Sequence, residues 1–216
     1  FGIIYGAEFI KKGFSLGRTY KQKTSNGYIL PAISLFLLLL LILKPSFLFF
    51  STKGPGSMYA PIIISLSVGL IIGILAQKSR ICMVGGIRDL YLIKDPHLII
   101  GFIAIFFWVL ILNLGFGYFN LGFEGQPAAH SDGLWNFLGM FLAGYGSILL
   151  GGCPLRQTIL AGQGNMDSVI TFFGLLVGAG IAHNFGLVGS TPNGHIAVIV
   201  GIVVLSIIGF INIKKD

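Results

Sequence analysis

Two short segments of this chain each place a cysteine beside glycines and an arginine, within otherwise apolar sequence. The first, KSRICMVGGIRD, contains Cys82 and Arg88, and the second, LLGGCPLRQTILAG, contains Cys153 and Arg156. A neutral thiol can donate a weak hydrogen bond, and a guanidinium group binds oxyanions strongly. The combination predicts a site that handles a small anion.

The second segment must leave the helical conformation at one point. Gly151 and Gly152 interrupt an apolar run, and Pro154 suits the first position of a new helix. Residues 154–162 then form a half-helix too short to span a bilayer, with free N–H groups and a positive dipole end at its start. Irregular backbone at membrane depth is tolerated only where it is buried in protein or lines a wet cavity. The predicted substrate-binding residues are Cys82, Cys153, Arg88, Arg156, Gly152, Pro154 and Gln157.

Most of these residues also have a simpler interpretation. A buried cysteine often packs as a small apolar side chain, and Arg88 with Asp89 would form an ion pair at the membrane boundary. Arg156 is harder to explain in this way, because an arginine near membrane depth costs at least about 2.5 kcal/mol. Two distant cysteines and four scattered histidines supply no recognisable four-ligand cluster, so no metal site and no cofactor are predicted. The chain also lacks the paired cysteines of a thiol–disulfide oxidoreductase.

The composition indicates the elements that must position such a site. Of the 216 residues, 55% are hydrophobic and 10% are charged, and the mean hydropathy is +0.90. Soluble domains carry about 25% charged residues, so the chain is predicted to be an all-α polytopic membrane protein. The first residues, FGIIYGAEF, lack the features of a cleavable signal peptide.

Six stretches are long and apolar enough for a transmembrane helix, which needs roughly 20 such residues. We expect a cytoplasmic connector at 1–27, a transmembrane domain at 28–212 and a cytoplasmic tail at 213–216, with short re-entrant or interfacial half-helices after spans two and four. The pair Lys44-Pro45 should end the first regular helix near Leu43. The predicted spans are 28–50, 59–77, 97–119, 134–150, 166–188 and 195–212.

The basic residues alternate between the two sides of these spans. One side receives 12 Lys and Arg residues and the other only Lys44 and Lys53. By the positive-inside rule the richer side is cytoplasmic, with both termini inside and the 120–133 loop outside. The net charge of +7 is thus a topology signal and does not indicate nucleic-acid binding. Both cysteines fall on the reducing side and are expected to be free thiols. The 12 residues are Lys11, Lys12, Arg18, Lys21, Lys23, Lys78, Arg80, Arg88, Lys94, Arg156, Lys214 and Lys215.

The two cysteine segments also belong to an internal repeat. Residues 68–102 and 142–174 each contain a span, a break, a cysteine, an arginine, an aspartate and a second span. The cysteines are 71 positions apart, and repeated units in transporters commonly place the substrate between them. Glycines within the spans further predict close helix packing. They are Gly69, Gly73, Gly139, Gly144, Gly174, Gly178 and Gly180.

Together, GGCPLRQTILAG, KSRICMVGGIRDL, FSTKGPGSMYAPIIISL and LGFEGQPAAH resemble the YeeE/YedE membrane proteins, most closely their branch of putative selenium transporters. The resemblance implies a bacterial inner-membrane transporter for thiosulfate or a similar anion, in which Cys82 and Cys153 line a narrow path near Arg88 and Arg156. It also implies a small sulfur-carrier partner of the TusA/SirA type. Family members are usually longer, and this chain resembles their C-terminal half, with GFSLGRTYKQ as a connector.

Three other functions compete with a transporter. A membrane scaffold would anchor a soluble sulfur or selenium carrier, and its function would survive cysteine substitution. A membrane sulfurtransferase would carry a persulfide on Cys82 or Cys153, but no general base stands beside either cysteine in the sequence. A general pore of the aquaporin type would need the paired Asn-Pro-Ala signature, which this sequence lacks. We therefore expect a transporter and not an enzyme.

Overall fold

The computed structural model describes residues 1–17, 27–48, 50, 52, 57–122, 130–189 and 191–213. Within these ranges the chain is helical and forms no strand. The helices are α1 (Gly2–Lys11), α2 (Ile29–Leu43), α3 (Ile62–Ser79), α4 (Met83–Ile93), α5 (His97–Gly115), α6 (Gly133–Leu149), α7 (Pro154–Gly162), α8 (Met166–Asn184) and α9 (Pro192–Ile211). Much of the predicted connector, of the 120–133 loop and of the C-terminal tail lies outside the described residues, as does Lys53.

The predicted class, an all-α polytopic membrane protein, is confirmed. In the part of the chain that the structure describes, five helical segments are long and apolar enough to cross a membrane. Two of the five are composite: residues 62–93 join α3 to α4, and residues 133–162 join α6 to α7. Each composite segment is broken in front of its second helix, which is where the sequence predicts a half-helix.

The first predicted span contains a helix shorter than expected. Helix α2 has 15 residues and is not among the five segments. At about 1.5 Å per residue it is shorter than the roughly 30 Å hydrocarbon core. It ends at Leu43 because Lys44 adopts a left-handed backbone conformation with φ of 45° and Pro45 follows.

Helix α1 is a feature that the sequence does not predict. It lies within the expected connector, yet it packs along α6 and buries Ile3, Ala7 and Phe9. Gly2 and Gly6 allow the close approach, since a methyl group on Gly6 would collide with Ile148 of α6. A helix of ten residues that ends at Lys11 and is followed by Lys12 is too short and too charged for a span, so a search for spans does not find it.

The predicted glycine packing is largely wrong. Added Cβ atoms at Gly69, Gly73, Gly139, Gly174, Gly178 and Gly180 would meet no described atom within 4 Å. Only Gly144 packs closely, 3.1 Å from Ile3 Cγ1 when a Cβ is placed on it. Close packing is concentrated around α6, which contacts α1, α4 and α9. Glycine spacing alone does not say which helix face meets a neighbour.

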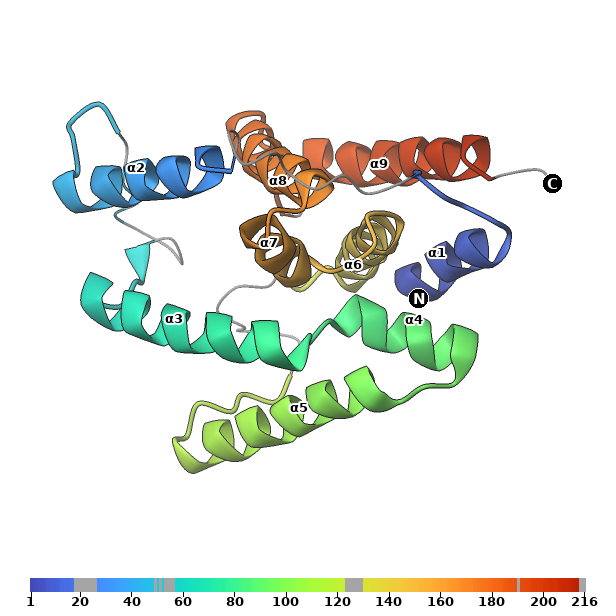
Figure 1. Ribbon diagram of the computed structural model, residues 1–216, viewed down its shortest axis with the longest axis horizontal. Coiled ribbons are helices and arrows are strands. Elements are labelled where there is room, and N and C mark those ends of the chain that lie inside the picture. The colour runs from blue at the N-terminus through green and yellow to red at the C-terminus, as the bar shows by residue number, and fades with distance from the viewer. Residues whose placement is uncertain are drawn as a thin grey trace.

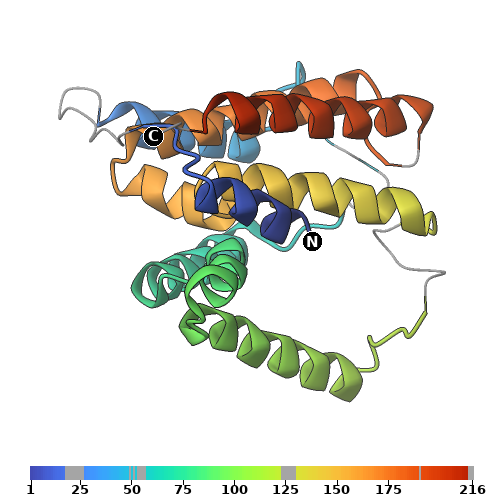
Figure 2. The same ribbon diagram turned by 90° about the vertical axis from the view of Figure 1, so that its right-hand side faces the viewer.

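The broken segment α6–α7 occupies the middle of the molecule. Helices α1 and α4 lie beside α6 and α8 lies beside α7, while α5 lies along the outer side of α4 (Figure 1). Figure 2 shows α6 running between α9 and the α4–α5 pair. The main core contains Ile3, Phe9, Tyr145 and Ile148 together with both cysteines. The cysteines thus sit where the packing is densest, and most other helix surfaces face outward, as lipid contact requires.

Candidate functional site at two helix breaks

The first break lies between α3 and α4. Arg80 ends α3 in a left-handed conformation with φ of 52°, and Cys82 is the N-cap residue of α4 with extended backbone. Its Sγ accepts a hydrogen bond from the backbone N–H of Gly85 at 3.3 Å. The thiol sulfur thus takes the place of the hydroxyl or carboxylate oxygen that usually caps a helix. Cys82 is therefore part of the local structure of its break.

The second break lies between α6 and α7 and is built differently. Gly151 has φ of 82°, and the N–H groups of Gly151 and Gly152 bond back to the carbonyls of Ile148 and Ser147, each at 3.0 Å. This is the glycine-terminated end common in helices. Cys153 is the N-cap residue of α7, and Pro154 opens the helix as predicted. In contrast to Cys82, the Cys153 side chain makes no capping hydrogen bond.

The two breaks meet at their cysteines. The backbone N–H of Cys153 donates to Cys82 Sγ at 3.5 Å. Both thiols are free, and the two residues are only 5% and 8% exposed. The N-termini of α4 and α7 therefore converge, and each brings free N–H groups and the positive end of a helix dipole. The convergence gives the junction a positive potential before any charged side chain is counted.

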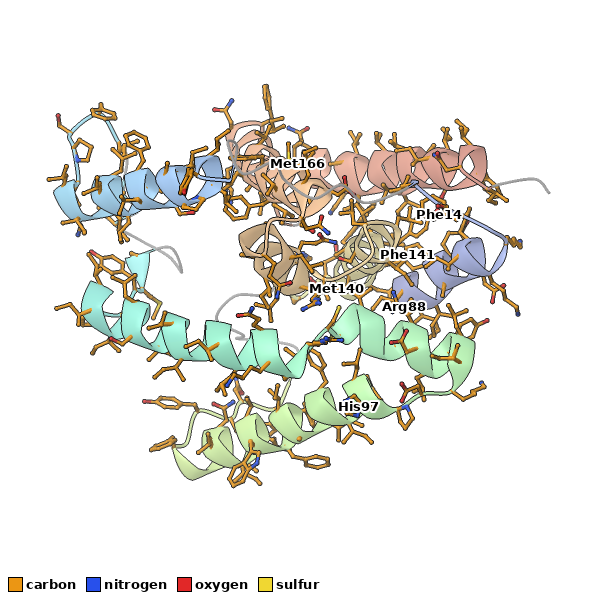
Figure 3. The ribbon with its side chains drawn as sticks, viewed as in Figure 1. Phe14, Arg88, His97, Met140, Phe141 and Met166 are labelled. Atoms are coloured by element: carbon orange, nitrogen blue, oxygen red, sulfur yellow. The ribbon has the colours of Figure 1, made fainter. Side chains whose placement is uncertain are left out.

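A cavity of about 410 Å³ reaches this junction from one direction. Its walls are mostly apolar, and Cys153 and Pro154 lie at its edge with Met83 of α4. The labelled side chains Met140 and Phe141 of α6 line the same cavity (Figure 3). A small solute in this cavity would meet the Cys153 thiol and the start of α7 together.

A second cavity, of about 460 Å³, begins on the following residues of α6. It is more polar, and Gly151, Gln157, Asn165 and Asp167 contribute to its walls. Phe14 lines it from the segment after α1 (Figure 3). The first cavity follows residues 137–147 of α6 and the second residues 148–151. Residues of the α6–α7 break thus line both cavities: Cys153 and Pro154 the first, and Leu150 and Gly151 the second.

Arg156 lies in the first turn of α7, and its aliphatic stem packs over Gly152. A Cβ placed on Gly152 would be 3.3 Å from Arg156 Cγ. Among the described residues, Arg156 Nη1 is buried and has no hydrogen-bond partner. A buried guanidinium nitrogen without a partner is costly, and an oxyanion at the start of α7 would satisfy it.

Arg88 occupies a different environment. It lies six residues beyond the N-cap of α4, and its Nε donates to Asp89 Oδ1 at 2.8 Å. The ion pair of the simpler interpretation is therefore present. Neither Arg88 nor Arg156 is among the described residues that line the two cavities, so the two arginines differ in their hydrogen bonding and not in cavity access. Its contribution to substrate binding stays a prediction.

Gln157 is brought to the second break, but its amide is already engaged at both ends. Nε2 donates to the carbonyl of Leu150 at 2.6 Å, and Oε1 accepts from Ser168 Oγ at 2.7 Å. Gln157 and Ser168 are 4% and 2% exposed. This geometry differs from the direct substrate contact suggested by the sequence.

Several residues of the site carry no sequence signal. Ser168 is an ordinary helix residue in sequence, and the cavity walls from α1 depend on a helix that was not predicted. The spacing Gly2-x-x-x-Gly6 was the only local sign that α1 packs against another helix. In addition, the hydroxyl of Tyr91 in α4 donates to the carboxylate of Glu8 in α1. Helix α1 therefore helps to hold α4, which carries Cys82.

Comparison with known proteins points to one family. Residues 78–208, more than half of the chain, match the family model described as Sulphur transport. The chain is 29% identical over 121 residues to the thiosulfate transporter TsuA of Escherichia coli (strain K12), covering 56% of this chain and 34% of that protein. It is 32% identical over 99 residues to TsuA of Spirochaeta thermophila (strain ATCC 700085 / DSM 6578 / Z-1203), covering 46% and 29%. The chain thus matches about a third of the length of these relatives, which are named as transporters. No solved structure matches the chain.

Proposed function

The chain belongs to the Sulphur transport family, as its resemblance to YeeE/YedE proteins indicated, and from this premise we propose that it passes a small sulfur- or selenium-containing anion across the bacterial inner membrane. The carrying observation is the meeting of two cysteine N-caps at 3.5 Å, at a helix break whose residues line two cavities. Thiosulfate is the first candidate, because both relatives are named for it. A selenium species is the second candidate, from the branch that the sequence resembles.

The site suits an anion with one soft and several hard atoms. The α7 N-terminus and Arg156 offer N–H groups to oxygen atoms. The Cys153 thiol, which makes no capping bond, can donate a weak S–H hydrogen bond to a terminal sulfur or selenium atom. Helix dipole ends carry only about half a charge each, so the anion is attracted without being trapped. A thiolate would repel the anion, and the neutral thiol is the transporting form.

The proposal also covers orientation and partner. The Lys- and Arg-rich side, which includes Lys78, Arg80 and Lys94, is the cytoplasmic side. The polar cavity beside Asn165 and Asp167 then opens toward this side, where the anion would be handed to a carrier of the TusA/SirA type.

Uptake into proteoliposomes tests the proposal. The intact protein, wild type or Cys153→Ala, is reconstituted and supplied with radiolabelled thiosulfate, selenite or sulfate. We expect wild type to accumulate thiosulfate or the selenium species in preference to sulfate, and Cys153→Ala to accumulate none at equal protein content. Undiminished uptake by Cys153→Ala would reject the cysteine path. A persulfide on Cys82 or Cys153, detected by mass spectrometry during turnover, would favour a sulfurtransferase. Loss of function only after loop substitutions would favour a scaffold.

A further inference from the structure

We propose that Gln157 is a positioning residue, which holds the α6–α7 break in shape so that Cys153 faces Cys82 and the apolar cavity. The inference rests on the proposed function for its transport readout. Gln157 then supports the backbone of the break and does not bind the substrate, and Ser168 becomes a second residue that the site needs.

The need for such a residue comes from the backbone of the break. When α6 ends, the carbonyls of its last turn lose their helical partners. The carbonyls of Ser147 and Ile148 are satisfied by the N–H groups of Gly152 and Gly151. The carbonyl of Leu150 receives its hydrogen bond from a side chain, Gln157 Nε2, at 2.6 Å. A glutamine one turn into α7 thus completes the end of α6.

Gln157 holds the break on both sides of the cysteine. Its backbone N–H donates to the carbonyl of Cys153 at 3.0 Å, which closes the first turn of α7. Its side chain bonds to Leu150, three residues before Cys153. The segment that carries the thiol is therefore fastened at each end to the same residue.

Ser168 anchors Gln157 in turn. The Ser168 hydroxyl donates to Gln157 Oε1 at 2.7 Å, and Ser168 lies in the first turn of α8, where its N–H bonds to Asn165 Oδ1 at 3.0 Å. Helices α7 and α8 pack extensively against each other. Since both side chains are almost fully buried, water does not compete for these bonds, and the amide orientation is well defined. The chain of bonds runs from the break, through Gln157, to a helix outside it.

The alternative, that Gln157 binds the anion, would require its amide N–H to be available. One of the two Nε2–H groups donates to Leu150, and Nε2 packs beside Gly152, where an added Cβ would lie 3.6 Å away, so a ligand role would have to use the second N–H in this packed position. Arg156, the neighbouring residue, has the unpartnered nitrogen. Two adjacent residues of α7 thus have different roles: Arg156 binds the anion, and Gln157 positions the α6–α7 break.

Four variants of the intact protein test this division. Gln157→Met keeps the volume of the side chain but removes both hydrogen bonds, and Ser168→Ala removes only the anchor. Gln163→Ala and Thr171→Ala are controls away from the break, because Gln163 is the C-cap residue of α7 and Thr171 is a hydroxyl residue of α8. For each variant, thiosulfate uptake gives the half-saturating concentration and the maximal rate. The rate of Cys153 alkylation by N-ethylmaleimide is measured without substrate, by mass spectrometry of the Cys153 peptide.

We expect Gln157→Met to lower the maximal rate by about fivefold or more with little change in the half-saturating concentration, because both buried hydrogen bonds of the side chain are lost. Cys153 alkylation should accelerate by a similar factor, since the break opens more often. Ser168→Ala should also lower the maximal transport rate and raise the rate of Cys153 alkylation, but by smaller factors. Both control variants should match wild type. The proposal would be overturned if Gln157→Met raised the half-saturating concentration while its Cys153 alkylation rate stayed at the wild-type value and Ser168→Ala transported like wild type. That result would favour a ligand role for Gln157. If wild type transports neither thiosulfate nor the selenium species, the proposed function fails, whereas the alkylation rates still decide the positioning role.

Discussion

Cys153 donates its backbone N–H to the Sγ atom of Cys82 at 3.5 Å, across 71 positions of the chain. Each of the two residues is the N-cap of a half-helix, yet they differ in what their sulfur atoms do. The Cys82 sulfur accepts bonds from Gly85 and Cys153, whereas the Cys153 thiol caps nothing. The pair therefore combines a sulfur that caps its own helix with one that does not.

Cys82 provides the first prediction, because capping and transport can be separated there. Cys82→Ser keeps an atom that can cap Gly85, and serine is a favourable N-cap residue. Cys82→Ala should lower the free energy of unfolding by about 1 kcal/mol relative to Cys82→Ser. Both variants should transport thiosulfate poorly, since neither retains sulfur. Denaturant titration and uptake measure the two effects, and wild-type uptake by Cys82→Ser would show that sulfur is dispensable at this position.

Arg156 provides the second prediction. Arg156→Gln should raise the half-saturating thiosulfate concentration by about tenfold, because a charge-assisted hydrogen bond to the anion is lost. Arg156→Lys should give a half-saturating concentration between those of wild type and Arg156→Gln, since lysine keeps the charge but not the guanidinium geometry. Arg88→Gln is the control: Arg88 is bonded to Asp89 and should leave half-saturation close to wild type. Equal effects at both arginines would contradict the assignment of the binding group to Arg156.

Gly152 provides the third prediction. A methyl group there would press on Arg156 Cγ, and the flexible arginine would move away from the start of α7. Gly152→Ala should thus weaken thiosulfate uptake, with a change in the free energy of unfolding below about 1 kcal/mol. Gly139→Ala, on the preceding helix in open space, should leave uptake unchanged. A normal half-saturating concentration in Gly152→Ala would mean that the position of the Arg156 stem is unimportant.

The fourth prediction concerns the packing of α1 on α6. Gly6→Ala places a methyl group against Ile148 and should destabilise the protein by about 1–3 kcal/mol, because overpacking forces the helices apart. Gly178→Ala, in the middle of α8 and facing open space, should be neutral or slightly stabilising, since alanine is the better helix former. Unfolding in a detergent titration compares the two. If both substitutions had the same effect, α1 would not be packed as described.

The sequence by itself determined the class of the molecule and the chemistry of its breaks. Hydropathy depends on local composition, so five of the six predicted spans overlap helices that are long and apolar enough to cross a membrane. The half-helix at residues 154–162 could be predicted because glycine and proline determine the local backbone conformation without any tertiary contact. The pairing of cysteine with arginine likewise depends only on which residues stand next to each other.

Tertiary structure alone decided which of these residues meet. No local rule places Cys82 beside Cys153, because the contact depends on how α4 packs against α6. The role of Gln157 also depends on tertiary contacts. The sequence predicts a substrate ligand, whereas in the structure its amide bonds to Leu150 and Ser168. The packing of α1 is decided in the same way, because the close approach at Gly2 and Gly6 requires Phe141 and Ile148 of α6 to lie beside them. Glycine spacing failed elsewhere for the same physical reason: a small residue permits close approach, but the neighbour must come from another part of the chain.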